Sequence, residues 1–168
     1  DTEALTTGSG DDVISINGLG RQGVLAGDGK NSITVSSTGT ISNAGASVDP
    51  LLMGNGNDTF SNSGKILGSV NAGLGDNTGS NKGLIEGYVA FDSGNDKFTN
   101  TGTITGDVYL GNGINFLTNN GTVDGKIFGG ANADTVTNSK IIDDEIDLGD
   151  GVDILTNSGT INDTVKMG

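Results

Sequence analysis

The chain lacks cysteine, histidine and tryptophan altogether and has a single proline among its 168 residues. Without cysteine and histidine it has no Ser-His-Asp triad, no thiol nucleophile, no disulfide and no tetrahedral zinc site built on nitrogen and sulfur. No run approaches the roughly 18 consecutive apolar residues of a transmembrane helix. Lysine and arginine number 8 against 21 aspartates and glutamates, so the formal net charge is −13. That charge argues against nucleic acid as a partner, and we expect no membrane insertion of this segment.

Glycine and asparagine are abundant instead. The chain has 31 glycines, about 18% of its residues against a typical ~7%. Leucine, isoleucine, valine and phenylalanine together make up about a quarter of the chain, which is above the roughly 20% below which chains are disordered. The length suits one domain, so the sequence predicts a single folded unit over residues 1–168 with a thin core.

An internal repeat of 19 residues organises the chain. Eight rows of this repeat begin at Thr7, Ala26, Met53, Ala72, Phe91, Leu110, Gly129 and Leu148. Row two carries an eight-residue insertion at about residues 42–52. A position within the row is called a column below, so that residues of one column recur every 19 residues.

Apolar residues recur in three even columns. They occupy column eight from Ile14 to Leu155, column fourteen from Ile66 to Ile161 and column eighteen from Val70 to Val165. Alternation along a row indicates extended chain with every second residue facing inward. A fixed repeat along the chain indicates stacked coils. The sequence therefore predicts an all-β fold, a single-stranded parallel β-helix (β-solenoid) of about eight 19-residue coils, with three short strands per coil and glycine-rich corners.

Column ten holds asparagine in every row from the third on. Its members are Asn62, Asn81, Asn100, Asn119, Asn138 and Asn157. Stacked side-chain amides can each donate to the oxygen of the next, which satisfies buried polar groups. We expect a structural asparagine ladder here.

Column six alternates between aspartate and asparagine until its end. It reads Asp12, Asn31, Asp58, Asn77, Asp96, Asn115, Asp134 and Asp153. Two interpretations stand side by side. Oxygen ligands suit Ca²⁺, so the column can hold calcium between coils. Alternatively, an asparagine between two aspartates relieves the repulsion of stacked carboxylates, so the ladder needs no metal.

The last two rows stack carboxylates directly. Asp134 lies above Asp153 in column six, and Asp144 lies above Asp163 in column sixteen. Stacked carboxylates without a cation should have a raised pKa in one member. These four residues are the candidate Ca²⁺ ligands, and a solvated acidic end is the favoured alternative.

Column nineteen gathers large apolar residues, among them Leu25, Leu52, Tyr109 and Phe128. Because 19 is odd, one residue per coil must break the alternation. We therefore expect column nineteen to turn inward, and an outward apolar stripe that serves as an interface is the alternative.

Few groups for catalysis remain. A polysaccharide-cleaving β-helix needs two carboxylates about 5–10 Å apart in a cleft. The insertion carries one acid, Asp49, with no arginine or histidine beside it. The sequence therefore predicts a non-enzymatic protein that requires no cofactor, with Ca²⁺ as the one candidate ligand.

The segments LGDGVDIL (148–155) and TNSGTINDTV (156–165) resemble the repeats of bacterial autotransporter passengers and adhesins. The same consensus runs from Leu52 to Lys166, with a weaker match from Thr7 to Leu51. The resemblance implies an exported β-solenoid, secreted or at the cell surface, that acts in adhesion, self-association or as a stalk. The implied partners are a host or neighbouring-cell surface, a glycan or further copies of the chain.

Two alternative functions stay open. The segments GNGND (54–58) and GDGVD (149–153) are similar to half of the calcium-binding RTX repeat, which implies a calcium-dependent β-roll-like module. The ends of a solenoid also expose complementary strand edges, so the chain can be a subunit of a head-to-tail extracellular filament or surface layer.

Overall fold

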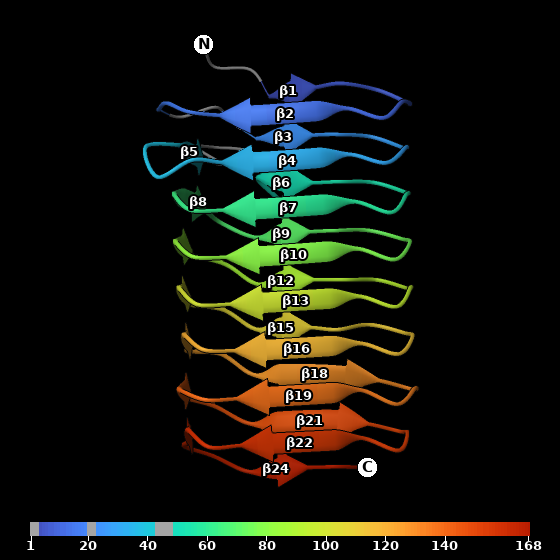
Figure 1. The fold of residues 1–168 in the computed structure, drawn as a ribbon, viewed down its shortest axis with the longest axis vertical. Coiled ribbons are helices and arrows are strands. Elements are labelled where there is room, and N and C mark those ends of the chain that lie inside the picture. The colour runs from blue at the N-terminus through green and yellow to red at the C-terminus, as the bar shows by residue number, and fades with distance from the viewer. Residues whose placement is uncertain (1–3, 20–22, 43–48) are drawn as a thin grey trace.

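The computed structural model describes residues 4–19, 23–42 and 49–168. Within these residues the protein is all-β and has no helix, and its 24 strands form three parallel sheets. The sheets stack into a β-solenoid of about eight turns, drawn in Figure 1 with its long axis vertical. The predicted fold class is therefore confirmed.

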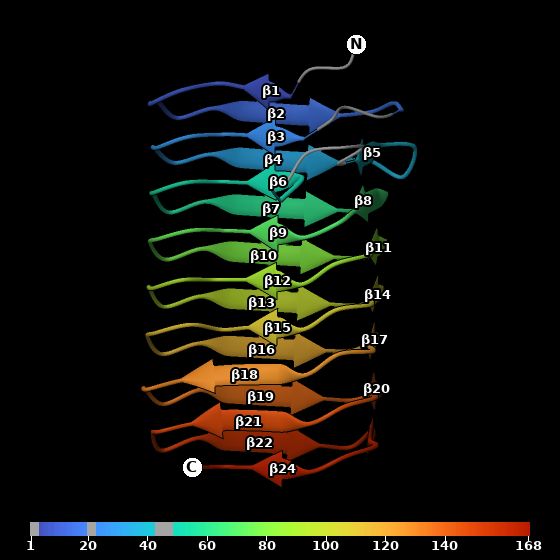
Figure 2. The same ribbon diagram turned by 180° about the vertical axis from the view of Figure 1, so that it is seen from behind.

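The nine-stranded sheet faces the viewer in Figure 2. Its strands are β1 (Leu5–Thr6), β3 (Val24–Leu25), β6 (Leu51–Leu52), β9 (Val70–Asn71), β12 (Val89–Ala90), β15 (Val108–Tyr109), β18 (Ile127–Gly130), β21 (Ile146–Gly149) and β24 (Val165–Lys166). They correspond to columns eighteen and nineteen. Strands β18 and β21 are longer and continue into columns one and two of the following row, and β24 pairs with β21.

The eight-stranded sheet faces the viewer in Figure 1. Its strands are β2 (Val13–Ile16), β4 (Ser32–Val35), β7 (Thr59–Asn62), β10 (Thr78–Asn81), β13 (Lys97–Asn100), β16 (Phe116–Asn119), β19 (Thr135–Asn138) and β22 (Ile154–Asn157). Each covers columns seven to ten, with columns eight and ten facing inward.

The seven-stranded sheet forms the narrow side of the solenoid, at the right-hand edge of Figure 2. Its strands are β5 (Thr40–Ser42), β8 (Lys65–Leu67), β11 (Leu84–Ile85), β14 (Thr103–Ile104), β17 (Thr122–Val123), β20 (Ile141–Ile142) and β23 (Thr160–Ile161). The remaining corner, opposite this sheet, consists of the glycine-rich turns of columns two to six.

Strand register follows the repeat from coil to coil. Asn81 pairs with Asn100 at an offset of 19 residues. Ser32 pairs with Thr59 at an offset of 27, because the insertion lies between them. Of the predicted insertion at 42–52, residues 43–48 lie outside the described residues, and the coil resumes in β6.

The core contains one apolar column more than the sequence predicts. Columns eight, fourteen and eighteen are buried as expected except in the last coil, where Leu155 and Ile161 are partly buried and Val165 is 38% exposed. Column one is buried too, with Ala26, Met53, Ala72, Phe91, Leu110 and Leu148 at 0–1% exposure. Column nineteen faces outward instead, so the expectation that it turns inward is wrong. Columns eighteen and one flank it and both point inward, which makes column nineteen the outward middle residue of a short strand.

Glycine serves two steric purposes in the coil. At the turn before β7, Gly54 and Gly56 adopt φ of 88° and 145°, which residues with a side chain rarely adopt. After β10, a Cβ added at Gly83 would stand 2.0 Å from the carbonyl oxygen of Gly64 in the neighbouring coil. Glycine therefore bends the chain at one corner and permits close coil stacking at another.

Candidate functional surfaces and corners

The corner before the eight-stranded sheet carries column six, whose side chains point into the coil interior. Each backbone N–H of this column donates to the Oδ1 of the column-six residue one coil further on. Asn31 donates to Asp58 (2.6 Å), Asp58 to Asn77 (2.8 Å), Asn77 to Asp96 (2.7 Å), Asp96 to Asn115 (2.9 Å), Asn115 to Asp134 (3.0 Å) and Asp134 to Asp153 (2.8 Å). Oδ1 of an aspartate and Oδ1 of an asparagine thus accept the same hydrogen bond from the preceding coil.

The asparagines of column six use their second terminal atom as a donor to the turn. Nδ2 of Asn31 donates to the carbonyl oxygens of Gly27 (3.0 Å) and Gly29 (3.2 Å). Nδ2 of Asn77 repeats this contact with Gly75 at 2.9 Å. The amide therefore closes the glycine-rich turn of its own coil.

The aspartates of column six have a second carboxylate oxygen instead of this amide nitrogen. Oδ2 of Asp58, Asp96, Asp134 and Asp153 is buried and has no hydrogen-bond partner. Burial raises the pKa of Asp58 and Asp134, and it raises the pKa of Asp96 to about 6. The N–H bonds from the preceding asparagines oppose this shift and do not cancel it.

The four candidate calcium ligands form two separate pairs. Asp134 and Asp153 share the column-six corner, where the N–H of Asp134 donates to Oδ1 of Asp153 at 2.8 Å. Asp144 and Asp163 precede β21 and β24 at another corner, and each accepts the N–H of its own following residue. Across residues 4–19, 23–42 and 49–168, no three acidic side chains converge as a metal group. Calcium binding at these residues stays a prediction.

Lysines partly neutralise the acidic C-terminal coils. Glu145 pairs with Lys126 at 3.0 Å and also with Lys166, which lies 3.8 Å from Asp147. Hydrogen bonds from Lys166 and Lys126 lower the pKa of Glu145. These groups stand near solvent, so the network links three successive coils of the nine-stranded sheet with modest energy.

The asparagine ladder lies along the inner end of the eight-stranded sheet. Nδ2 of each residue donates to Oδ1 of the next, from Asn62 to Asn81 (2.8 Å), Asn81 to Asn100, Asn100 to Asn119 and Asn119 to Asn138 (each 2.9 Å), and Asn138 to Asn157 (2.8 Å). Each amide also donates to a carbonyl oxygen of the next coil's seven-stranded sheet, as Asn100 does to Thr122 at 3.1 Å. The ladder therefore ties two sheets together across the coil interface.

Three aromatic rings lie next to one another along the nine-stranded sheet, Tyr109 in β15, Phe128 in β18 and Tyr88 directly before β12. Tyr109 and Phe128 stack with centroids 5.0 Å apart, and Tyr88 meets Tyr109 edge-on at 6.0 Å. The Tyr88 hydroxyl donates to the carboxylate of Asp49, with oxygen distances of 2.7 and 2.8 Å. The end of the insertion is thereby anchored to a coil 39 residues further along the chain. Column nineteen therefore faces outward, with Tyr109 and Phe128 as stacked neighbours between polar and charged members such as Asn71 and Asp147. An interface role for this stripe stays a prediction.

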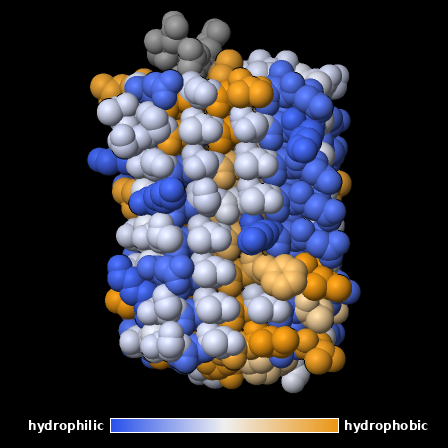
Figure 3. Space-filling model, viewed as in Figure 1, coloured by the Kyte–Doolittle hydropathy of each residue, from blue (hydrophilic) through white to orange (hydrophobic). Residues whose placement is uncertain are grey.

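Hydroxyl side chains line the opposite face. Column nine consists only of serine and threonine in all eight coils: Ser15, Thr34, Ser61, Ser80, Thr99, Thr118, Thr137 and Thr156. Figure 3 shows the face over β2 to β22 mainly as pale columns of near-neutral hydropathy, with orange hydrophobic patches near the top and at the lower right and the hydrophilic glycine-rich corner along the right edge. This face offers a regular array of hydroxyls at strand spacing, about 4.8 Å.

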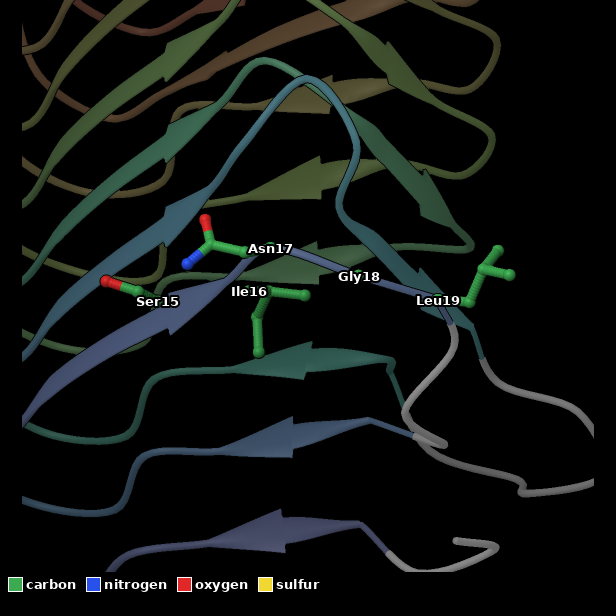
Figure 4. A pocket seen from close by; sticks show the side chains of 5 residues that line it. All are labelled: Ser15, Ile16, Asn17, Gly18 and Leu19. Carbon is green, nitrogen blue, oxygen red and sulfur yellow. The ribbon is translucent and has the colours of Figure 1, made fainter.

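A hollow of about 260 Å³ lies at the end of β2 in the first coil. Its lining comprises Ser15, Ile16, Asn17, Gly18 and Leu19, shown in Figure 4. None of these side chains titrates, and the insertion residue Asp49 lies against Tyr88 instead. Among the described residues, the lining of this hollow therefore includes no acid–base pair of the kind that sugar hydrolysis needs.

No family model, curated protein or solved structure matches the chain. The described residues include no helix of the length and apolar character needed to cross a membrane.

Proposed function

We propose that this chain is a non-enzymatic structural module, a rigid β-solenoid rod of a bacterial surface protein that acts outside the cell. The observation that carries the proposal is the unbroken register of parallel strands, in which each coil repeats the hydrogen bonds of the one before. Such stacking gives length and stiffness from few apolar residues, because each coil is held mainly by its neighbours. The module needs no cofactor for this role.

The outward faces supply the adhesive part of the proposal. The hydroxyl array of column nine repeats along the rod axis in every coil, and Tyr88, Tyr109 and Phe128 form one aromatic cluster across three successive coils. Repetition favours many weak contacts at once, so that avidity can exceed the affinity of any single contact. The partners we propose are a host or neighbouring-cell surface, a glycan, or another rod.

Bead binding tests the adhesive role. Beads coated with the purified chain should cluster with one another or attach to cell surfaces or immobilised glycans, and beads coated with denatured chain should not. Substitution of Tyr109 and Phe128 by serine gives a first matched variant, and substitution of Thr99, Thr118 and Thr137 by alanine gives a second. Beads that neither cluster nor attach to any of these surfaces would contradict the adhesive role, and only the role as a stalk would remain.

Each of two alternative functions is supported by one specific observation. The unpartnered Oδ2 atoms of column six favour a calcium-dependent module, which melting with EDTA and then with calcium tests directly. The edge strands β22, β23 and β24 each pair on one side only, so they can pair with a further coil of a longer chain or of another copy. Elongation that rises with protein concentration, seen by electron microscopy, would favour the head-to-tail filament.

A further inference from the structure

The aspartates and asparagines of column six are interchangeable in shape. Both receive the N–H of the preceding coil on Oδ1, at 2.6 Å for Asp58 and 2.8 Å for Asn77. The turns that precede them have the same left-handed glycines, Gly54 and Gly56 before one and Gly73 and Gly75 before the other. Because the two side chains differ only in one terminal atom, Oδ2 of each aspartate stands where Nδ2 of each asparagine stands.

That place is built to receive a hydrogen-bond donor. Around Nδ2 of Asn31 stand three carbonyl oxygens, those of Gly27, Gly29 and Met53, at 3.0 to 3.4 Å. An ionised carboxylate has acceptors only, so its Oδ2 would set lone pairs against the lone pairs of turn carbonyls. Asp58, Asp96 and Asp134 are each 1% exposed, so water does not relieve this contact.

We propose that column six is a proton-binding ladder, in which Asp58, Asp96 and Asp134 take up protons and their Oδ2–H groups donate to the turn carbonyls as the asparagine amides do. A protonated carboxyl is neutral and nearly isosteric with the side-chain amide. Asp58 and Asn77 can therefore alternate on one turn geometry, with Gly54 and Gly56 before the first and Gly73 and Gly75 before the second. The turn before Asp96 keeps only Gly94 of this pair, and the turn before Asp134 has no left-handed glycine. In this ladder the acid form satisfies the fold, and the ionised form leaves a buried charge and an unpartnered oxygen.

The surroundings of these carboxyls favour the neutral form. The charged groups that act on them are themselves carboxylates, Asp76 and Asp92 on Asp96 and Asp153 on Asp134. Around Asp58 the hydrogen bonds from Asn31 act against burial, and burial is the larger effect. A positive charge would favour the ionised form, and none is among the groups that shift these three pKa values.

The sign of the pH effect follows from the raised pKa values. Asp96 moves from 3.8 to about 6, so the folded state binds a proton more tightly than the unfolded chain. The stabilisation is fully present below about pH 4 and is lost as pH rises through about 6, where this one carboxyl changes the unfolding equilibrium roughly 100-fold. Mild acid should therefore stabilise this solenoid, whereas most acidic proteins lose stability as their paired carboxylates are protonated.

Melting by circular dichroism at pH 5 and pH 8, in EDTA, tests the ladder. The variant is the triple substitution Asp58→Asn, Asp96→Asn and Asp134→Asn. The control removes the same charge from three exposed sites, Glu86→Gln, Asp124→Asn and Asp143→Asn. We expect the parent and the control to melt higher at pH 5 than at pH 8. We expect the variant to melt higher than the control at pH 8 and to lose most of the pH difference.

Three results would overturn the proposal. A variant that melts lower than the control at pH 8 would mean that the ionised carboxylates are needed. A calcium-induced rise in melting temperature that the parent shows and the variant lacks would mean that a cation, rather than a proton, occupies the place. As a direct readout, the infrared band of protonated carboxyl groups should be present in the folded parent at pH 5. The variant should show a weaker band, and an equal band would place the protons elsewhere.

Discussion

The asparagine ladder makes the sharpest stability prediction, because its middle members are fully buried and bonded on both sides. Asn100 is 0% exposed. Its Nδ2 donates to Oδ1 of Asn119 (2.9 Å) and to the carbonyl oxygen of Thr122 (3.1 Å), and its Oδ1 accepts from Nδ2 of Asn81 (2.9 Å). Asn100→Leu keeps nearly the same volume and removes all three hydrogen bonds.

The magnitude can be worked from those contacts. Three buried hydrogen bonds at a net ~1 kcal/mol each amount to about 3 kcal/mol. The Thr122 carbonyl oxygen loses its amide donor, which adds about 1–3 kcal/mol of desolvation cost. The leucine offsets about 1 kcal/mol through apolar burial. The loss should be about 3–5 kcal/mol, and the melting temperature should fall by roughly 10 °C.

Thermal and urea unfolding followed by circular dichroism measure this loss. Thr99→Val is the matched control, because it lies on the same strand, faces outward and leaves the ladder intact. The control should unfold close to the parent. If Asn100→Leu also melts with the parent, then column ten adds nothing to coil cohesion and the reasoning from buried amides fails.

Three other perturbations follow from the packing. A Cβ at Gly79 would stand 2.4 Å from the Phe60 ring and 2.9 Å from the Phe98 ring, so Gly79→Ala should overpack the core and cost about 1–3 kcal/mol in urea unfolding. An unchanged urea midpoint would show that the two rings can move aside. Tyr88→Phe removes the bond to Asp49, so limited proteolysis should cut near the insertion faster than in the parent, whereas Tyr109→Phe should leave that rate unaltered. Burial and Asp49 raise the pKa of Tyr88 to about 12, and the hydrogen bond with Asp107 raises the pKa of Tyr109. Absorbance titration should show both phenols ionising above their usual pH, and Asp49→Asn should lower the pKa of Tyr88 alone.

The repeat made most of the fold predictable, and the exceptions have local causes. The 19-residue spacing of Ile66, Ile85 and Ile104 is visible without any structure, and so is the run of asparagines in column ten. The burial of column one was not predicted, because the small residues Ala26, Ala72 and Gly129 stand among its large apolar members. Of those large members, Phe91 and Leu110 are fully buried. A coil of 19 residues must break the inward–outward alternation at one position, and the sequence does not show which position that is. The structure keeps the alternation through columns eighteen, nineteen and one, so that column nineteen faces outward.

The sequence predicted the column-six ladder but not the contacts of its side chains with the turns. The alternation of aspartate and asparagine suggested relief of carboxylate repulsion, which concerns neighbouring coils. The contact that matters lies within one coil, between a column-six side chain such as Asn77 and the turn carbonyl of Gly75. The hydrogen bond between Tyr88 and Asp49 joins residues 39 positions apart, which is not a multiple of the repeat. The periodicity of the sequence therefore could not predict this contact.

The strand register and the side-chain ladders of this protein repeat every 19 residues from Met53 on, so each coil offers the next the same set of backbone and ladder partners. An in-frame duplication or loss of one repeat in the gene would therefore preserve the strand pairing and change the height of the stack by one strand spacing of about 4.8 Å. Contacts that depend on particular neighbouring coils, such as that of Tyr88 with Asp49, would change only near the altered repeat. A population of genes could in this way vary the reach of the proposed stalk in small, equal steps.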